Sequence, residues 1–174
     1  QRQMCIRDSP REDRILSWDF TIESGEFSVG PATVLGNPTL YQVESIQADK
    51  NYQTLLVAEE MKEHHKVMAL DLMTGEVIKE DLGNFDRGND PEGIALVINK
   101  DNNGYWICTE QSKTDNRFHL YDRKTLEYKT TMYLDNVSYT DGIATAYMHG
   151  KWYLYAVDND ARVVACLLYT SDAA

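Results

Sequence analysis

The sequence predicts an all-β protein built from a repeated unit. Aromatic and β-branched residues are plentiful, and no segment keeps a helical period of apolar residues for three turns. The stretches "QVESI", "DPEGI" and "YTDGI" share an acid, a small residue and an isoleucine in the same order. Their acids, Glu44, Glu92 and Asp141, are 48 and 49 residues apart, which indicates an internal repeat.

Two further elements recur at a similar interval. The apolar runs "LLVAEE", "WICTEQ" and "LYAVDN" follow the three stretches and end in polar residues. The segment "VMALDLMTGEV" matches "FHLYDRKTLEY", with an offset of 51 between Asp71 and Asp122, and "ILSWDFTIESGEF" is the same element with a longer turn. A period near 50 residues with several short strands per unit is typical of a β-propeller blade.

Each unit is expected to contain four strands joined by turns rich in Asn, Asp, Gly and Thr. In the best-defined unit the expected strands are Gly93–Asn99, Tyr105–Thr109, Arg117–Asp122 and Tyr128–Leu134. The chain then holds the last two strands of one blade, two whole blades, and the first two strands and part of the third of another. Complete propellers have about four to eight blades, so these roughly three blades' worth of strands predict a partial propeller with exposed sheet faces.

The two ends of the chain read as opposite strands of one DNA element. Back-translation of "QRQMCIRDS" gives, on the complementary strand, codons for "CLLYTSDA", the sequence that begins at Cys166. This pairing is typical of a sequencing adaptor carried into a reading frame. We therefore expect residues 1–9 to be an unstructured artefact, residues 166–174 to be a second artefact, and the propeller domain to span residues 10–165, without native termini.

Composition excludes several classes of function. A net charge of −11 disfavours binding to nucleic acids and to anionic membranes. Cys108 is the one cysteine outside the two ends, so neither a disulfide framework nor a thiolate metal site is expected. It lies in the apolar run "YWICT" and is predicted to be a small buried hydrophobe. No stretch is long and apolar enough to span a bilayer.

The repeat places a set of polar side chains on one face of the propeller. Successive strands of a blade alternate in direction, so the start of the first strand and the end of the second lie at the same face. The residues at these positions that we predict to bind metal are Glu44, Glu60, Asp90, Glu92, Gln111 and Asp141. Asn159 shares the position, but a turn asparagine requires no function.

These acids are expected to ring the mouth of the central channel, because the first strand of each blade lines it. Like charges gathered there cost free energy unless a cation joins them. Carboxylate and amide oxygens without a nearby cysteine favour calcium over zinc.

Four stretches resemble the second half of the β-propeller phytases, in order and with few gaps, from about Val43 to Asp160. They are "LLVAEE", "DPEGIALVINKDNNGYWICTEQS", "HLYDRKTLEY" and "SYTDGIATAYMHGKWYLYAVDND". The resemblance implies a six-bladed fold and a calcium-dependent enzyme that hydrolyses the phosphomonoesters of myo-inositol hexakisphosphate with metal-activated water. It also implies a secreted or periplasmic protein that is monomeric when full length.

The resemblance implies the same metal ligands as the repeat: Glu60 or its neighbour Glu59, Asp90, Glu92, Gln111 and Asp141. Glu44 is predicted from the repeat alone. Glu110 is an extra acid relative to the family pattern and puts the local calcium geometry in question. The loops on this face also carry basic residues that match no family position, namely Lys62, Arg87, Lys113 and Arg117.

The remaining conspicuous residues are expected to have structural roles. His64 and His65 are predicted to form a solvated loop pair, and Asp71 and Asp122 to cap tight turns. Gly93 is expected to let the backbone turn into the first strand, after a loop stiffened by Pro91. Aromatic residues recur in the second strands and are predicted to pack between blades: Tyr105, Trp106, Trp152 and Tyr153. Asn136-Val137-Ser138 matches a glycosylation acceptor, which is a weak signal.

Two other functions fit the same pattern. The chain could come from a different propeller hydrolase, such as a lactonase or esterase with one metal ion in the channel. It could also come from a non-catalytic propeller that uses this face as a binding platform. Lysines and arginines in the remaining blades would distinguish a phosphatase from both alternatives.

Overall fold

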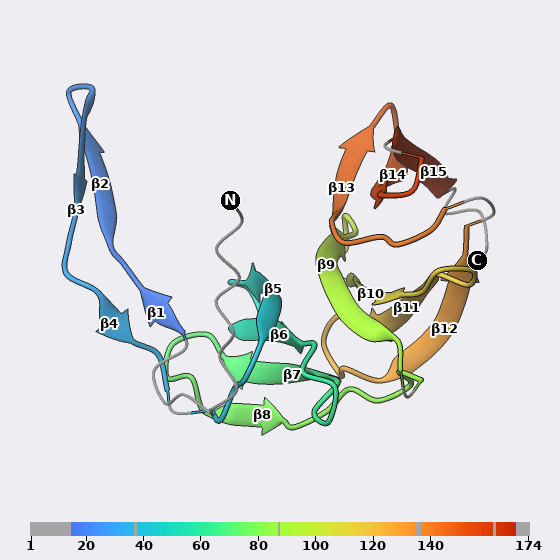
Figure 1. The fold of residues 1–174 in the computed structure, drawn as a ribbon. Coiled ribbons are helices and arrows are strands. Elements are labelled where there is room, and N and C mark those ends of the chain that lie inside the picture. The colour runs from blue at the N-terminus through green and yellow to red at the C-terminus, as the bar shows by residue number, and fades with distance from the viewer. Residues whose placement is uncertain (1–14, 37, 87, 135–136, 162, 170–174) are drawn as a thin grey trace.

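Every regular element in the computed structural model is a β-strand (Figure 1). The structure describes residues 15–169 apart from residues 37, 87, 135–136 and 162. Within these residues there is no helix, and therefore none that could cross a membrane. The all-β fold predicted from the sequence is confirmed.

Two complete four-stranded antiparallel sheets form the centre of the molecule, each with its strands in chain order. The first consists of β5 (Val43–Asp49), β6 (Thr54–Glu59), β7 (Lys66–Asp71) and β8 (Val77–Lys79). The second consists of β9 (Asp90–Ile98), β10 (Gly104–Gln111), β11 (Arg117–Asp122) and β12 (Tyr128–Tyr133). Two successive sheets of this meander topology are two blades of a propeller.

Incomplete sheets flank these two blades. On one side lies a three-stranded sheet of β13 (Ile143–Met148), β14 (Lys151–Asp158) and β15 (Val163–Tyr169). On the other side is a long hairpin, in which β1 (Leu16–Ser17) pairs with β4 (Thr33–Val34) and β2 (Phe20–Glu23) pairs with β3 (Glu26–Val29). The division into blades matches the prediction from the repeat.

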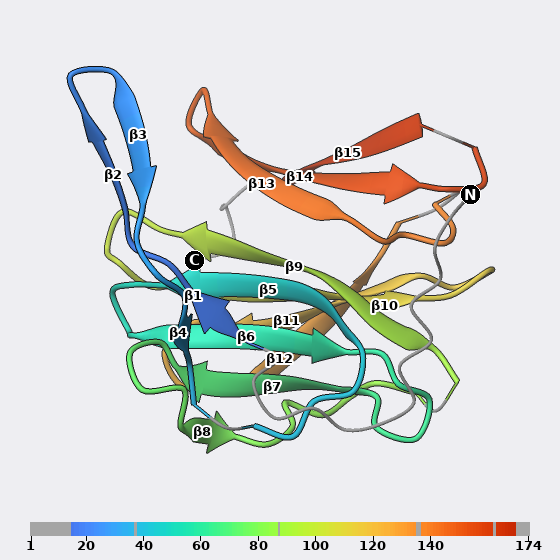
Figure 2. The ribbon, with the colours of Figure 1, turned by 60° about the vertical axis from the view of Figure 1, so that its left-hand side comes forward.

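The innermost strands β5, β9 and β13 run beside one another, so the sheets fan out from them (Figures 1 and 2). Side chains bridge neighbouring inner strands at the repeat interval. The Ile94 N–H donates to Ser45 Oγ at 3.2 Å, and Thr145 Oγ1 donates to the Leu96 carbonyl at 2.8 Å. This arrangement brings the three strand entries to one end of the molecule.

The apolar core lies between the sheets. Trp106, Cys108 and Tyr121 of the second blade are fully buried against Leu56 and Val67 of the first. Burial strongly raises the pKa of the Cys108 thiol, so this cysteine is the inert core residue that the sequence predicts. A second interface packs the second blade against the three-stranded sheet and includes Tyr105 and Trp152.

The predicted turn caps are confirmed. Asp71 Oδ1 accepts the N–H groups of Met73 and Thr74 at 2.9 and 2.8 Å. Asp122 Oδ1 accepts those of Lys124 and Thr125 at 3.0 and 2.8 Å.

A buried ion pair joins the two complete blades near the opposite end from the strand entries. Arg123 Nη2 and Nε lie 2.8 and 2.5 Å from the two carboxylate oxygens of Asp49, and both side chains are almost fully buried. The Arg123 guanidinium also donates to the Asn102 carbonyl at 2.6 Å. This connection between residues 74 positions apart has no counterpart in the sequence predictions.

The largest differences from the predicted strand bounds are at the start of β9 and the end of β15. The first strand of the second blade begins at Asp90 rather than at Gly93, so Pro91 lies within β9, opposite Glu110. Strand β15 continues through residues 166–169, which were assigned to the adaptor. Almost any sequence can form the backbone hydrogen bonds of a strand, so the adaptor origin of residues 166–174 stays a prediction. Residues 1–9 and 170–174 lie outside the described part of the chain.

A candidate metal centre at the channel mouth

Irregularities in strand pairing place two acids at the channel mouth. Val43 lies opposite Glu59 and Ser45 opposite Ala58, so Glu44 is an extra residue in β5. In β9 the corresponding irregularity falls at residues 92–93, between the pairs Pro91–Glu110 and Ile94–Cys108. A β-bulge redirects the side chain of the extra residue, which explains why acids at strand entries do not follow the ordinary alternation.

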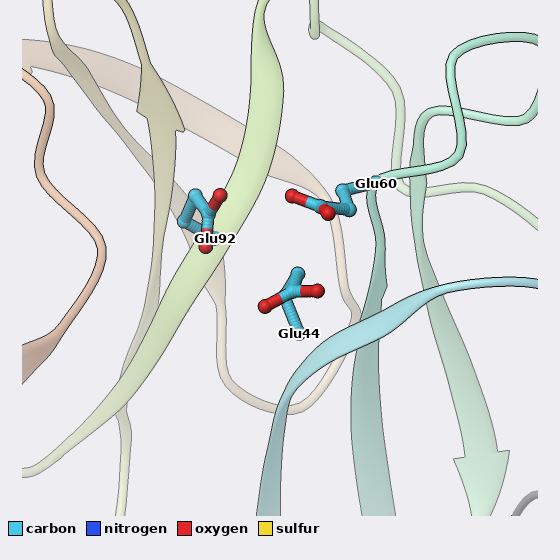
Figure 3. Close-up of side chains that lie close together, drawn as sticks. All are labelled: Glu44, Glu60 and Glu92. Carbon is cyan, nitrogen blue, oxygen red and sulfur yellow. The ribbon is translucent and has the colours of Figure 1, made fainter. Parts of the chain in front are cut away.

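Three carboxylates from two blades meet at this point. Oxygen atoms of Glu44, Glu60 and Glu92 all lie within 4.8 Å of one another (Figure 3). Glu44 and Glu92 come from the bulges in β5 and β9, and Glu60 directly follows β6. Glu92 is buried, Glu60 is half-buried and Glu44 is exposed, so the group opens to solvent on one side.

The carboxylates of this triad repel one another's charge. Burial, followed by the charge of Glu44, raises the pKa of Glu60 from 4.5 to about 7. Burial, followed by the charges of Glu60, Glu44 and Asp141, raises the pKa of Glu92 from 4.5 to about 9. Without a cation, the site therefore favours protonated carboxyl groups at neutral pH.

The other predicted ligands surround the triad. The charge of Asp90 contributes to the raised pKa of Glu60, and the charge of Asp141 to that of Glu92. Asp141 is held between two amides, because Gln111 Nε2 donates to one of its carboxylate oxygens and Asn159 Nδ2 to the other. The structure thus gathers Glu44, Glu60 and Glu92 within ligand distance of one another and places Asp90, Gln111 and Asp141 around them.

His65 is less solvated than the sequence suggests. Its side chain is only 10% exposed, and Nε2 lies 3.1 Å from Asp90 Oδ1, an ion-pair distance without hydrogen-bond geometry. His64 is exposed and stacks on Tyr41, with ring centroids 4.0 Å apart. The prediction of a solvated pair is therefore wrong for His65, because the loop folds back against the entry to β9.

Glu59 and Glu110, the two acids whose part in the metal site the sequence left undecided, point away from the triad. Glu59 is fully buried and accepts backbone N–H groups from Tyr41 and Gln42, both at 2.5 Å, so Glu60 is the residue that faces the site. Glu110 is also fully buried, and its oxygens lie 2.6 Å from His119 Nε2 and from Asn89 Nδ2. Burial opposes ionisation of Glu110, but these hydrogen bonds outweigh it and lower its pKa.

Gly93 has a different role from the one expected. Its φ is not positive, so no turn requires glycine there. A Cβ atom at this position would lie 2.8 Å from the Asp141 carbonyl oxygen and 2.9 Å from the Ile143 nitrogen. Gly93 is therefore needed for the close approach of β9 to the entry of β13, which brings Glu92 and Asp141 together.

Among the described basic residues of these loops, Arg117 is bound by acids of this part of the chain. Arg117 pairs with Asp115 at 2.6 Å and with Asp86, and its Nη1 lies 3.4 Å from Glu110. The side chains of Lys62 and Lys113 are exposed. Arg87 and Asn136 lie outside the described residues.

Sequence reasoning missed Asn89 and His119, which hold Glu110, and the contact of His65 with Asp90. One signal was available: an acid directly precedes each of Glu60, Gln111 and Asn159. Alternation along a strand sends two successive side chains to opposite faces, so an acid beside a predicted ligand points into the blade.

Comparison with known families decides where the chain belongs. A family model described as Phytase matches residues 25–157, a span that includes the triad and its flanking residues. The chain belongs to the phytase family. No curated protein matches the chain. Phytases are phosphatases, so membership indicates a hydrolase that acts on a phosphorylated small molecule, and the β-propeller architecture of the family agrees with the observed blades.

Proposed function

We propose that the chain is part of a calcium-dependent phytase that hydrolyses the phosphomonoesters of myo-inositol hexakisphosphate. The observation that carries the proposal is the triad Glu44, Glu60 and Glu92, whose carboxylate oxygens lie within 4.8 Å of one another in a phytase-family fold. Three like charges at this distance are stable when a cation lies between them.

The donor set fits calcium. The triad offers carboxylate oxygens from two blades, and Asp90, Asp141 and the Gln111 amide add oxygen donors around it. Calcium takes 6–8 oxygen ligands in flexible geometry, and an open group of acids with mixed exposure can supply several of them. Cys108 is buried in the core, so its thiol does not compete as a ligand for a softer metal.

Calcium bound here would neutralise phosphate oxygens and supply an activated water molecule as the nucleophile. The protein's own part is to hold the ligands. Gln111 and Asn159 orient both oxygens of Asp141, and the bulges in β5 and β9 aim Glu44 and Glu92 at the same point. The acidic site would otherwise repel a polyphosphorylated substrate, so the cation is also needed for binding.

Export of the full-length protein forms part of the proposal. Sites built from exposed carboxylates are filled most readily where calcium is abundant, outside the cytoplasm. The family resemblance likewise implies a secreted or periplasmic protein.

A propeller hydrolase of another class is the second candidate. The compact triad suits a single metal ion, which is also the arrangement expected of a lactonase or esterase. Such an enzyme would require no cluster of lysines and arginines around the mouth.

The experiment is phosphate release from phytate by the full-length protein that contains this chain, measured with calcium and again after chelation. We expect release that requires calcium and returns when calcium is restored. Release that a chelator leaves unchanged would contradict the calcium mechanism. Absence of release together with hydrolysis of a lactone or carboxylic ester would favour the second candidate.

A further inference from the structure

In three blades the structure describes the second strand, and in each of them two successive polar residues stand where that strand ends. The pairs are Glu59-Glu60, Glu110-Gln111 and Asp158-Asn159. In each pair the first side chain is buried, with 0%, 0% and 2% exposure, while the second is at least partly exposed on the side of the channel mouth. The second residues belong to the candidate metal centre, and the buried acids are so far without a role in it.

Two of the buried acids share one kind of partner. Glu59 accepts the backbone N–H groups of Tyr41 and Gln42, which directly precede β5 and Glu44. Glu110 accepts Asn89 Nδ2 at 2.6 Å, and Asn89 directly precedes Asp90. In both blades the acid contacts the loop that enters the first strand of its own blade. Asp158 differs, because its Oδ1 accepts the Ala161 N–H at 2.9 Å and caps the turn after β14.

Asp49, a further buried acid of the described residues, does not follow this pattern. Asp49 is equally buried, but it pairs with Arg123 of the next blade and lies at the far end of β5 from Glu44. A buried acid is a poor way to gain stability, because apolar residues of similar size do as well without the cost of desolvation. An acid at the same place in two blades, bound each time to a ligand-bearing loop, indicates a role in geometry.

We propose that Glu59 and Glu110 are positioning residues that fix the strand-entry loops and thereby set the distances between the acids of the metal centre. The inference rests on the proposed calcium site. Glu59 holds the entry to Glu44 through two backbone amides and also accepts the Met61 N–H at 3.2 Å, so one carboxylate orients both Glu44 and the residue after Glu60. Glu110, fixed by His119 at 2.6 Å, does the same for the entry to Asp90 and Glu92 through Asn89.

The test measures calcium binding by calorimetry, with the metal ion alone as probe, on the full chain and three variants. Glu59→Gln keeps the shape of the side chain but turns an amide N–H group toward a backbone N–H. Asn89→Ala removes the side-chain amide through which the strand-entry loop contacts Glu110, and it leaves the buried Glu110–His119 pair intact. Partners that orient metal ligands are worth about 10- to 100-fold in affinity, so each variant is expected to weaken calcium binding by at least about tenfold.

Asp49→Asn is the matched control, since it alters a buried acid of the same blade that pairs with Arg123 and not with a strand-entry loop. It is expected to lower the midpoint of urea unfolding while leaving calcium affinity within about twofold, because distant sites behave independently. Asp122→Asn, at an exposed turn, serves as a second control if the first does not fold. Equal calcium affinity in wild type, Glu59→Gln and Asn89→Ala would overturn the positioning role and leave the proposed calcium site standing.

A measurement without calcium separates this inference from the proposed function. Amide hydrogen exchange at Tyr41 and Gln42 is expected to be faster in Glu59→Gln than in wild type, and unchanged in Asp49→Asn. If the wild-type chain binds no calcium, the proposed function fails, and the exchange experiment still decides whether Glu59 anchors the loop. Unchanged exchange at both amides in Glu59→Gln would overturn the inference.

Discussion

At the scale of single residues, the candidate site is a group of carboxylates that the fold holds close together although their charges repel one another. Glu60 and Glu92 have raised pKa values because they are withdrawn from water next to other carboxylates. A raised pKa of an acid lowers the free energy of unfolding at pH values where the unfolded chain ionises that acid, because ionisation is harder in the folded state than in the unfolded state. The metal-free protein is therefore destabilised by the same residues that would bind a cation.

The pH dependence of stability follows from these two groups. Between pH 4.5 and about 7 the folded state retains protons on both Glu60 and Glu92 that the unfolded state has released, and between about pH 7 and about pH 9 it retains the proton on Glu92. The free energy of unfolding of the metal-free chain should therefore fall as pH rises through this window. Urea unfolding at several pH values checks this, and saturating calcium should flatten the dependence. A free energy of unfolding that rises from pH 6 to pH 9 without metal would contradict the assignment.

Neutralising one member of the triad should have opposite effects on stability and on metal binding. Glu92→Gln removes a carboxyl group that keeps its proton in the folded state at pH 8 while the unfolded state releases it, so without calcium we expect the free energy of unfolding to rise by on the order of 2 kcal/mol. Asp122→Asn is the control, because it keeps the capping oxygen but removes the charge that strengthens its hydrogen bonds, and it should lower stability by no more than about 1 kcal/mol. Urea unfolding measures both. A destabilised Glu92→Gln would mean that this carboxylate makes favourable contacts without a metal ion.

At the scale of secondary-structure elements, the entries of the inner strands combine bulges with a close approach between blades. The repeat was sufficient to place the four strands of the second blade, and β11 has the predicted bounds of Arg117–Asp122. The bulges at Glu44 and at residues 92–93 could not be predicted, because a bulge depends on the register against β6 and β10. The role of Gly93 was missed for the same reason, since it depends on the backbone of another blade.

Gly93 and its repeat counterpart Gly142 should respond differently to alanine. In Gly93→Ala the new methyl group would meet the Asp141 carbonyl oxygen at 2.8 Å, an overpacking expected to cost about 1–3 kcal/mol. In Gly142→Ala the nearest atom is Val157 Cγ2 at 3.8 Å, an ordinary contact, so the change should stay within about 0.5 kcal/mol. Urea unfolding compares the two. Equal losses of stability would show that β9 and the entry of β13 are further apart than described.

At the scale of the whole molecule, the arrangement is an open part of a ring. Hairpin β2–β3 extends from the body (Figure 1), and its large apolar side chains are exposed. Phe20 pairs with Val29 and Ile22 with Phe27, so all four lie on one face of the hairpin, while Thr21 and Ser28 occupy the other. One apolar and one polar face are typical of a strand pair that packs against another sheet, which is what a closed propeller supplies.

The blades were predictable because their pattern repeats within the sequence, whereas single-copy contacts were not. Glu44, Glu60 and Glu92 could be grouped in advance because three blades carry related residues at one place. The Asp49–Arg123 pair and the contact of His65 with Asp90 occur once, with no repeat to reveal them. The repeated acid before each predicted ligand was a signal that separates Glu59 from Glu60, and the hydrogen bonds of Glu59 with Tyr41 and Gln42 make the assignment.

The exposed hairpin should make the isolated chain associate with itself. We expect sedimentation at micromolar concentration to show oligomers, and the double variant Phe20→Thr with Phe27→Thr to reduce them, because two large exposed apolar side chains are lost.

The isolated chain should release no phosphate from phytate, since it holds only part of the mouth. Turnover by the isolated chain would show that the chemistry lies elsewhere.

Calcium affinity of the chain, with and without the Glu92 carboxylate, tests the central claim most directly. Calorimetric titration of the wild-type chain with calcium should show saturable binding, and Glu92→Gln should weaken it by at least about tenfold while the variant stays folded. Asp71→Asn, which alters an acid of an exposed turn away from the triad, should bind calcium as the wild type does. Absence of saturable binding by a folded wild-type chain, or equal affinity in wild type and Glu92→Gln, would contradict the account.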